Sequence, residues 1–117
     1  MSRSYGLGKQ GEKIVCKYLE KNKYIILDTN FNTRTGEIDI IAKDQNEIVF
    51  IEVKTRTNSK YGIPAEAVTQ EKLKRIYKTA QYYIHKRNLY NISARIDVIE
   101  VLAKENKYYI KHLKNVV

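Results

Sequence analysis

Apolar and polar positions along this chain follow two periods, one typical of helices and one typical of strands. Apolar residues recur at helical spacing from about residue 7 to residue 22 and from Thr69, the expected N-cap, to about Lys86. Shorter apolar runs bounded by turn residues predict strands at 24–27, 37–43, 47–55, 94–102 and 107–113, with a polar, irregular segment at 28–35. The order helix, three strands, helix, two strands predicts an α/β domain with a mixed sheet of about five strands flanked by two helices.

The second and third strands are expected to form an antiparallel hairpin, because the turn-forming run Asp44-Gln45-Asn46 lies between them. In the later strand both faces are apolar until Glu52 and Lys54, so this strand is predicted to be central and buried. A loop of two residues would place Ile41 opposite Phe50, Asp39 opposite Glu52, and Glu37 opposite Lys54. An odd loop would send Asp39 to the other face of the sheet.

Composition adds a positive charge and removes several classes of protein. The 117 residues carry 22 Lys and Arg against 13 Asp and Glu, which gives a formal net charge of +9. This length supports one core, so we expect a single domain over residues 1–117. The positive charge favours a phosphate-bearing partner. We expect no membrane span and no signal peptide, and therefore a cytoplasmic location. One cysteine, Cys16, and two histidines, His85 and His112, exclude an internal disulfide and a Cys/His zinc site, and we predict no convergent partners for them.

The run from Gly6 to Gly11 spells G-x-G-x-x-G, a string associated with dinucleotide binding. That function needs a strand before the first glycine, and the five preceding residues are too few to supply one. We therefore expect no nucleotide cofactor. The glycines are interpreted instead as a way for the first helix to pack closely on the sheet, or as a mobile start to that helix.

The candidate chemistry lies where the buried strand becomes charged. Asp39, Glu52 and Lys54 are predicted to converge there, and two directly opposed carboxylates repel each other unless a proton or a metal lies between them. Hard oxygen ligands on a rigid sheet suit Mg²⁺, which also binds phosphate oxygens. The structural alternative is a Glu37–Lys54 ion pair, with Asp39 merely ending a strand.

The spacing of Asp39 and Glu52-Val53-Lys54 on consecutive strands resembles the PD-(D/E)xK signature of restriction-endonuclease-like nucleases, including archaeal Holliday-junction resolvases. Ile38 stands where that signature has its proline. From about Tyr5 to Val101 the chain more closely resembles the YraN-type family of uncharacterised bacterial proteins. The matching motifs are Gly8-x-x-Gly11-Glu12, Gly36-Glu37-Ile38-Asp39-Ile40-Ile41, Val49-Phe50-Ile51-Glu52-Val53-Lys54-Thr55-Arg56, Gly62-x-Pro64, Ala67-Val68, Lys72 and Arg95-Ile96-Asp97-Val98-Ile99.

This resemblance implies a restriction-endonuclease-like fold, a Mg²⁺ (or Mn²⁺) cofactor and DNA as substrate. By the same resemblance, Asp39 and Glu52 would bind the metal together with the backbone carbonyl of Val53. Lys54 would orient or help deprotonate the attacking water, or stabilise charge on the phosphate. Glu12 resembles the additional helical carboxylate of such sites, although a solvated helix charge is an equal alternative, and Glu37 is a second candidate acid.

Basic and aromatic residues outline an expected nucleic-acid track: Arg34, Arg56, Lys60, Tyr61, Lys72 and Arg75. Three other tyrosines, Tyr18, Tyr77 and Tyr83, fit apolar stripes and are expected in the core.

The sequence thus favours a Mg²⁺-dependent endodeoxyribonuclease, a hydrolase of phosphodiester bonds, with branched DNA as the preferred substrate. Because junction-cutting relatives act as dimers, a homodimer is a further expectation. Two alternatives stay open: a non-catalytic nucleic-acid-binding protein on a nuclease-like fold, and a small interaction module whose charge is incidental.

Overall fold

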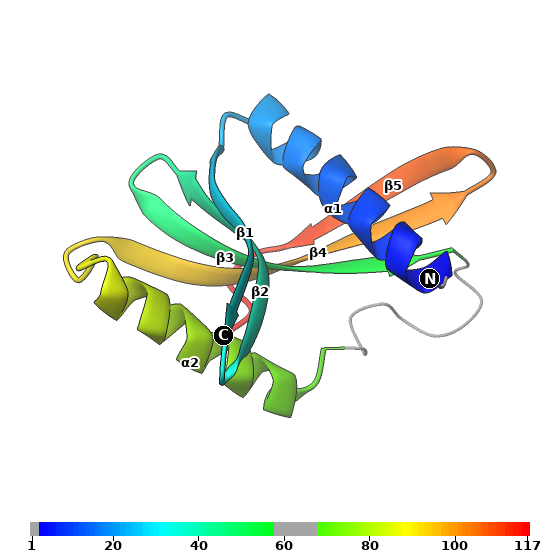
Figure 1. Ribbon diagram of the computed structural model, residues 1–117. Coiled ribbons are helices and arrows are strands. Elements are labelled where there is room, and N and C mark those ends of the chain that lie inside the picture. The colour runs from blue at the N-terminus through cyan, green and yellow to red at the C-terminus, as the bar shows by residue number, and fades with distance from the viewer. Residues whose placement is uncertain (1–2, 58–67) are drawn as a thin grey trace.

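The computed structural model describes residues 3–57 and 68–117, and it forms an α/β sandwich (Figure 1). A five-stranded sheet runs through the middle, α1 lies over one face, and α2 lies across the other. The predicted fold class and order of elements are confirmed. The elements are α1 (Arg3–Lys21), β1 (Ile25–Thr33), β2 (Gly36–Asp44), β3 (Glu47–Arg56), α2 (Gln70–Lys86), β4 (Ser93–Lys104) and β5 (Lys107–Leu113).

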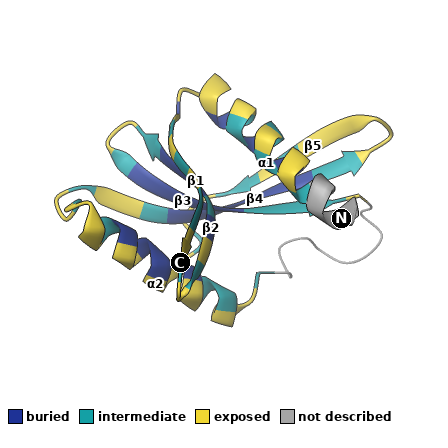
Figure 2. Ribbon diagram, in the orientation of Figure 1, coloured by how far each residue is buried: buried dark blue, intermediate teal, exposed yellow. Residues whose placement is uncertain are grey.

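The strands lie in the order β1-β2-β3-β4-β5, so the sheet follows the order of the chain. All neighbours are antiparallel except β3 and β4, which run parallel. A parallel pair needs a crossover, and the segment that contains α2 supplies it. The centre of the sheet is buried, as Figure 2 shows by its dark blue segments.

Two apolar clusters, one on each face, hold the helices to the sheet. On the α1 side the cluster consists of Val15, Leu19, Tyr24, Ile40, Ala42, Val49, Ile51, Ile99 and Val101. On the α2 side it consists of Ile38, Ile41, Ile48, Phe50, Ile76, Ala80, Tyr83 and Ile96. Residues of β3 alternate between the two clusters, which confirms that this strand is central and buried.

The β2–β3 hairpin has the register that a two-residue loop predicts. Ile41 pairs with Phe50, and the last pair before the loop joins Asp44 to Glu47. Gln45, in the loop, adopts a positive φ of 56°. The ladder extends from this loop as far as Ile40 and Ile51, which is where the candidate site begins.

Strand β1 differs from the sequence expectation. A strand of residues 24–27 with an irregular continuation was predicted, whereas β1 extends to Thr33. The strand is nevertheless irregular. Its register to β2 shifts between Ile26 and Asp28, and Asn30 has a φ of 53°. Pairing with β2 therefore overrides the low strand propensity of these Asp, Asn and Thr residues.

The glycines of α1 differ in their role in packing. They lie within the helix, which already includes Arg3, so the glycine turn of a dinucleotide site is absent from the described residues. A Cβ atom on Gly11 would lie 2.1 Å from Thr55 Oγ1, whereas a Cβ on Gly8 would meet nothing within 4 Å. Gly11 thus allows α1 to approach β3 closely. Neither helix, within the part of the chain that is described, has the length and apolar character needed to cross a membrane.

Candidate active site

The candidate site forms where β2 and β3 stop pairing. Beyond the Ile40–Ile51 pair, Asp39 Oδ2 accepts a hydrogen bond from the backbone N–H of Val53 at 2.8 Å. Ile38 packs in the α2-side cluster and Ile40 in the α1-side cluster, although they are only two residues apart. A regular strand would put them on one face, so the alternation of side chains between the two faces of β2 is interrupted at Asp39. At this irregularity the Asp39 carboxylate contacts the β3 backbone.

Glu52 lies beside this point on the buried α2-facing side of β3, with 5% of its surface exposed. Lys72 Nζ is 2.6 Å from Glu52 Oε2, and Lys54 Nζ is 3.5 Å from the same oxygen. Lys54 comes from the end of β3, whereas Lys72 comes from the first turn of α2. A cavity of about 170 Å³ lies here, lined by Gly36, Glu37, Asp39, Glu52, Lys72, Arg75 and Ile76.

Burial and mutual repulsion perturb the charges of this group. Burial, followed by the negative charge of Glu52, raises the pKa of Asp39 from 3.8 to about 7, even though the Val53 N–H favours its ionised form. Burial, together with neighbouring Lys72, lowers the pKa of Lys54. Burial also acts to lower the pKa of Lys72, but its bond to Glu52 outweighs that effect and raises it. Such clustering of perturbed groups is typical of functional sites.

Two further acids, Glu37 and Glu12, border the site. Glu37 is exposed and lines the same cavity as Asp39 and Glu52. Glu12 follows Gly11 on α1, lies 3.8 Å from Lys9 Nζ, and raises the pKa of Asp39 by its charge. Lys54 contacts Glu52. The β2–β3 ladder ends at Ile40 and Ile51, so the predicted direct pairs Asp39–Glu52 and Glu37–Lys54 are not formed.

The donor set of the site suits a hard divalent cation. Within residues 3–57 and 68–117, no three Asp, Glu, His or Cys side chains converge closely enough to hold a metal by themselves. Mg²⁺ does not require that, because proteins commonly hold it by one or two carboxylates while it keeps several waters. Asp39 and Glu52 line one cavity, and the charge of Glu52 raises the pKa of Asp39, so the two acids fit this mode of binding.

The residues of the expected nucleic-acid track occupy different places. Arg75 lines the acidic cavity, and Lys72 is part of the charged group itself. Arg34 lies in the β1–β2 turn and lines a separate cavity of about 420 Å³ together with Lys78 and Lys86. Arg56 ends β3, half-buried. Lys60 and Tyr61 lie outside the described residues.

One acid near the site was not predicted. Glu100 on β4 is the parallel neighbour of Lys54 and is 3% exposed. Neither carboxylate oxygen has a hydrogen-bond partner in the described part of the chain. An acid within the apolar run of 96–102 was the available signal, but its position beside Lys54 follows only from the β3–β4 pairing.

Both histidines have side-chain partners, contrary to the expectation from the sequence. His112 Nε2 lies 2.7 Å from Asp97 Oδ2, and His112 Nδ1 lies 2.9 Å from the hydroxyl of Tyr18. His85 contacts the hydroxyl of Tyr90. The prediction that both histidines lack convergent partners is therefore wrong. For His112 the partners are far away in the sequence and meet only through α1 packing and β4–β5 pairing.

Asp97 and Arg95 form the centre of a polar network on β4. Asp97 is fully buried and accepts from Arg95 Nε at 3.0 Å and from the Asn115 N–H at 2.9 Å, besides its contact with His112. Arg95 also lies 2.6 Å from Glu47 and 3.2 Å from Asp44. This network joins β4 to the β2–β3 turn, β5 and the C-terminal segment.

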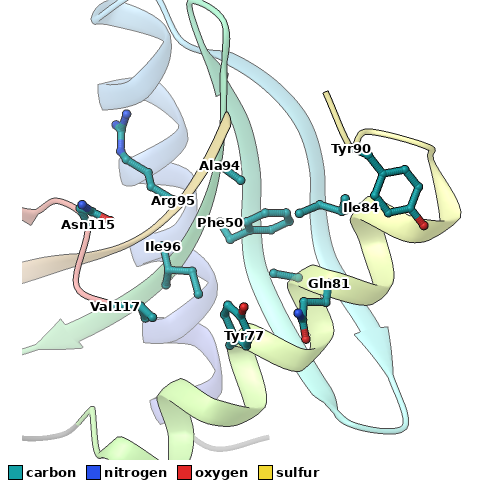
Figure 3. A pocket seen from close by; sticks show the side chains of 11 residues that line it. Phe50, Tyr77, Gln81, Ile84, Tyr90, Ala94, Arg95, Ile96, Asn115 and Val117 are labelled. Atoms are coloured by element: carbon teal, nitrogen blue, oxygen red, sulfur yellow. The ribbon is translucent and has the colours of Figure 1, made fainter. Parts of the chain in front are cut away.

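The tyrosines expected in the core divide into three environments. Tyr83 is buried, Tyr18 is half-buried against His112, and Tyr77 is 48% exposed. The prediction for Tyr77 is therefore wrong, because its place at the edge of the apolar stripe of α2 leaves it half uncovered. Tyr77 also borders a larger apolar cavity of about 410 Å³ (Figure 3).

This larger cavity lies between α2, the start of β4 and the C-terminal segment. Figure 3 shows Tyr77, Gln81 and Ile84 projecting from α2, with Phe50 and Ile96 on the sheet side. No carboxylate of the described residues lines it. Its chemistry is that of an apolar surface, so the smaller cavity, which Asp39, Glu52 and Lys72 line, is the better candidate for catalysis.

Comparison with known proteins gives a consistent family. The profile of the uncharacterised protein family UPF0102 matches residues 11–101. A UPF0102 protein of Clostridium botulinum (strain Loch Maree / Type A3) is 51% identical over 112 residues, which cover 93% of this chain and 91% of the relative. A UPF0102 protein of Alkaliphilus metalliredigens (strain QYMF) is 46% identical over 114 residues, covering 96% of this chain and 98% of the relative.

Proposed function

Since this chain belongs to the uncharacterised protein family UPF0102, we propose its function from the site itself: a divalent-metal-dependent endonuclease that hydrolyses phosphodiester bonds in DNA. The observation that carries this proposal is the convergence of Asp39, Glu52 and Lys72 at one small cavity, with Lys54 in contact with the same Glu52 oxygen. Burial and the negative charge of Glu52 penalise the ionised form of Asp39, and a bound cation would relieve both effects.

The proposed ligands of the cation are Asp39, Glu52 and the backbone carbonyl of Val53, with water in the remaining positions. When bound, Mg²⁺ or Mn²⁺ would polarise the scissile phosphate and acidify a neighbouring water. In the reaction the water oxygen forms a new bond to phosphorus, one P–O ester bond breaks, and a proton passes to the leaving oxygen.

Lys54 is the proposed partner of the reacting phosphate. Its Nζ lies beside Glu52 and has a lowered pKa, because burial and Lys72 disfavour its charged form. A lysine so placed can orient the attacking water and stabilise negative charge that develops on the phosphate oxygens. Glu12 and Glu37 add negative charge at the border of the site, and we assign them no direct step.

DNA is the proposed substrate because the protein is basic outside the acidic centre. The net charge is +9, Arg75 borders the acidic cavity, and Arg34, Lys78 and Lys86 line a neighbouring one. Such groups bind phosphates through charge and counterion release. Within DNA we favour branched substrates, and we propose a homodimer as the cutting form, both on the resemblance to junction-cutting nucleases.

The test is a cleavage panel of supercoiled plasmid, single-stranded DNA and a four-way junction, with Mg²⁺, Mn²⁺ or EDTA. We expect metal-dependent cutting that falls at least ~100-fold in Asp39→Asn and Glu52→Gln, while DNA binding is retained. Glu71→Gln is the matched control, because Glu71 is an exposed acid on the first turn of α2 and should leave cutting unchanged.

Other outcomes favour the alternatives. If the protein binds DNA tightly but cuts none of these substrates with any metal, a non-catalytic DNA-binding function replaces the proposal. If it does not bind DNA even at ~50 mM salt, where phosphate contacts are least screened, the role of an interaction module replaces both.

A further inference from the structure

Glu52 is neutralised by lysines from two different elements, and the closer one is not the lysine of the catalytic signature. Lys72 Nζ lies 2.6 Å from Glu52 Oε2, compared with 3.5 Å for Lys54 Nζ. Both contacts converge on one oxygen of a carboxylate that is almost fully buried. The shortest cationic contact of the acidic pair therefore comes from α2.

Lys72 is in an unfavourable place for a cation apart from this contact. Thr69 caps α2, and its hydroxyl accepts from the backbone N–H of Lys72 at 3.1 Å, so Lys72 belongs to the first helical turn. The N-terminus of a helix carries partial positive charge and repels cations by a few tenths of a kcal/mol to about 1 kcal/mol. The acids at the sheet offset this cost, since both Glu52 and Asp39 attract Lys72.

A lysine and a divalent cation would compete for this oxygen, because their positive charges repel each other at such distances. A Mg²⁺ ion lies about 2.1 Å from its carboxylate ligands, so its two positive charges would adjoin an ammonium group held at 2.6 Å. The Lys72 ammonium group can move away from Glu52 towards solvent, because about a third of its side chain is exposed (32%). It also lines the cavity that the substrate phosphate would enter.

We propose that Lys72 is an internal counter-ion that holds the cation position beside Glu52 until a divalent metal displaces it, and that the displaced lysine then binds the substrate phosphate. This inference rests on the proposed function in one respect, because it needs Asp39 and Glu52 to bind a divalent cation. It adds a coupling between metal and nucleic acid. Because linkage is reciprocal, each ligand strengthens the binding of the other by the same factor.

The first experiment measures metal binding without DNA. Mn²⁺ is titrated by calorimetry into the wild type, Lys72→Met, Lys72→Arg and Lys74→Met. Lys74 is the matched control, since it is an exposed lysine on the same helix. We expect Lys72→Met to bind Mn²⁺ about tenfold tighter or more, because it removes the competing charge while keeping most of the side-chain volume. Lys72→Arg, which keeps the charge, and Lys74→Met should match the wild type.

The second experiment measures the coupling. Fluorescence polarisation gives the affinity for a DNA duplex with and without Mn²⁺ at constant ionic strength, with gels that verify that the DNA stays intact. Mn²⁺ should strengthen DNA binding by the wild type and by Lys74→Met, and by at least threefold less in Lys72→Met. Equal strengthening in all three proteins overturns the role of Lys72 at the phosphate.

Failure of this inference and failure of the proposed function give different results. If Lys72→Met folds, as its thermal melt reports, and binds Mn²⁺ no tighter than Lys74→Met, the counter-ion role is overturned even where cleavage is observed. If the wild type and Glu52→Gln bind Mn²⁺ equally, the metal does not use this site and both ideas fail. Tighter binding by Lys72→Met supports the counter-ion role whether or not cleavage occurs.

Discussion

At Asp39 the proposed function and the stability of the fold oppose each other. Burial and Glu52 raise its pKa to about 7, so at higher pH the folded protein carries an unfavourable negative charge. Below about pH 4 the side chain is protonated in both the folded and the unfolded state. As the pH rises from 4 to 7 the unfolded chain releases this proton first, and stability falls accordingly.

Replacement of Asp39 by Asn should therefore stabilise the metal-free protein in a pH-dependent way. The difference between a pKa of 3.8 and about 7 corresponds to at most ~4 kcal/mol, and we expect a gain of about 1–3 kcal/mol at pH 8 that falls towards zero at about pH 3. Urea denaturation in EDTA at the two pH values measures it, with Glu71→Gln as an exposed control. An equal loss of stability at both pH values would contradict the conclusion that the ionised Asp39 side chain destabilises the folded protein.

At the scale of elements, the approach of α1 to β3 depends on a single glycine. Gly11→Ala would place a methyl group 2.1 Å from Thr55 Oγ1, so either the helix or the threonine must shift. We expect a loss of about 1–3 kcal/mol, although alanine favours helix formation by up to about 1 kcal/mol. Gly8→Ala meets nothing within 4 Å and should show only that helical gain. Chemical denaturation measures the free energy of unfolding of both variants. Similar changes in this free energy for Gly11→Ala and Gly8→Ala would refute close packing at Gly11.

Local sequence patterns predicted most elements because the same residues decide both the local structure and the burial. The α2 N-cap at Thr69, the β5 range and the hairpin register follow from short-range chemistry. The length of β1 did not, because pairing with β2 extends a segment of poor strand formers. For the site, the grouping of Asp39, Glu52 and Lys54 was predictable from one hairpin. The Lys72 contact and buried Glu100 were not, since each depends on the crossover that follows β3.

At the scale of the whole molecule, Asp97 joins elements that are distant along the chain. Burial alone would raise the pKa of Asp97, but hydrogen bonds from His112, Arg95 and the Asn115 N–H outweigh it and hold this pKa below 3.8. Its stabilising effect is therefore fully present above about pH 4 and is lost as the pH falls through the lowered pKa.

Asp97→Asn should accordingly destabilise the protein by about 2–4 kcal/mol at pH 7, because Arg95 loses its buried charge partner. The difference from the wild type should shrink as the pH approaches 3. Asp44→Asn, which removes a more exposed partner of Arg95, should cost less than about 1 kcal/mol. Thermal melts across this pH range compare the three proteins. A loss for Asp97→Asn that does not vary with pH would exclude the charge as its cause.

The parallel pairing of β3 with β4 also sets an order for folding. The β2–β3 hairpin closes over a two-residue loop, a local event of microseconds, whereas Glu47 can meet Ser93 only after the whole crossover has closed. During that interval Asp39 and Glu52 belong to a hairpin that α2 has not yet joined, so Lys72 is absent from their side. We expect the charged centre to be completed late, together with the slow long-range step. A divalent cation present during refolding would then bind Asp39 and Glu52 before Lys72 reaches them.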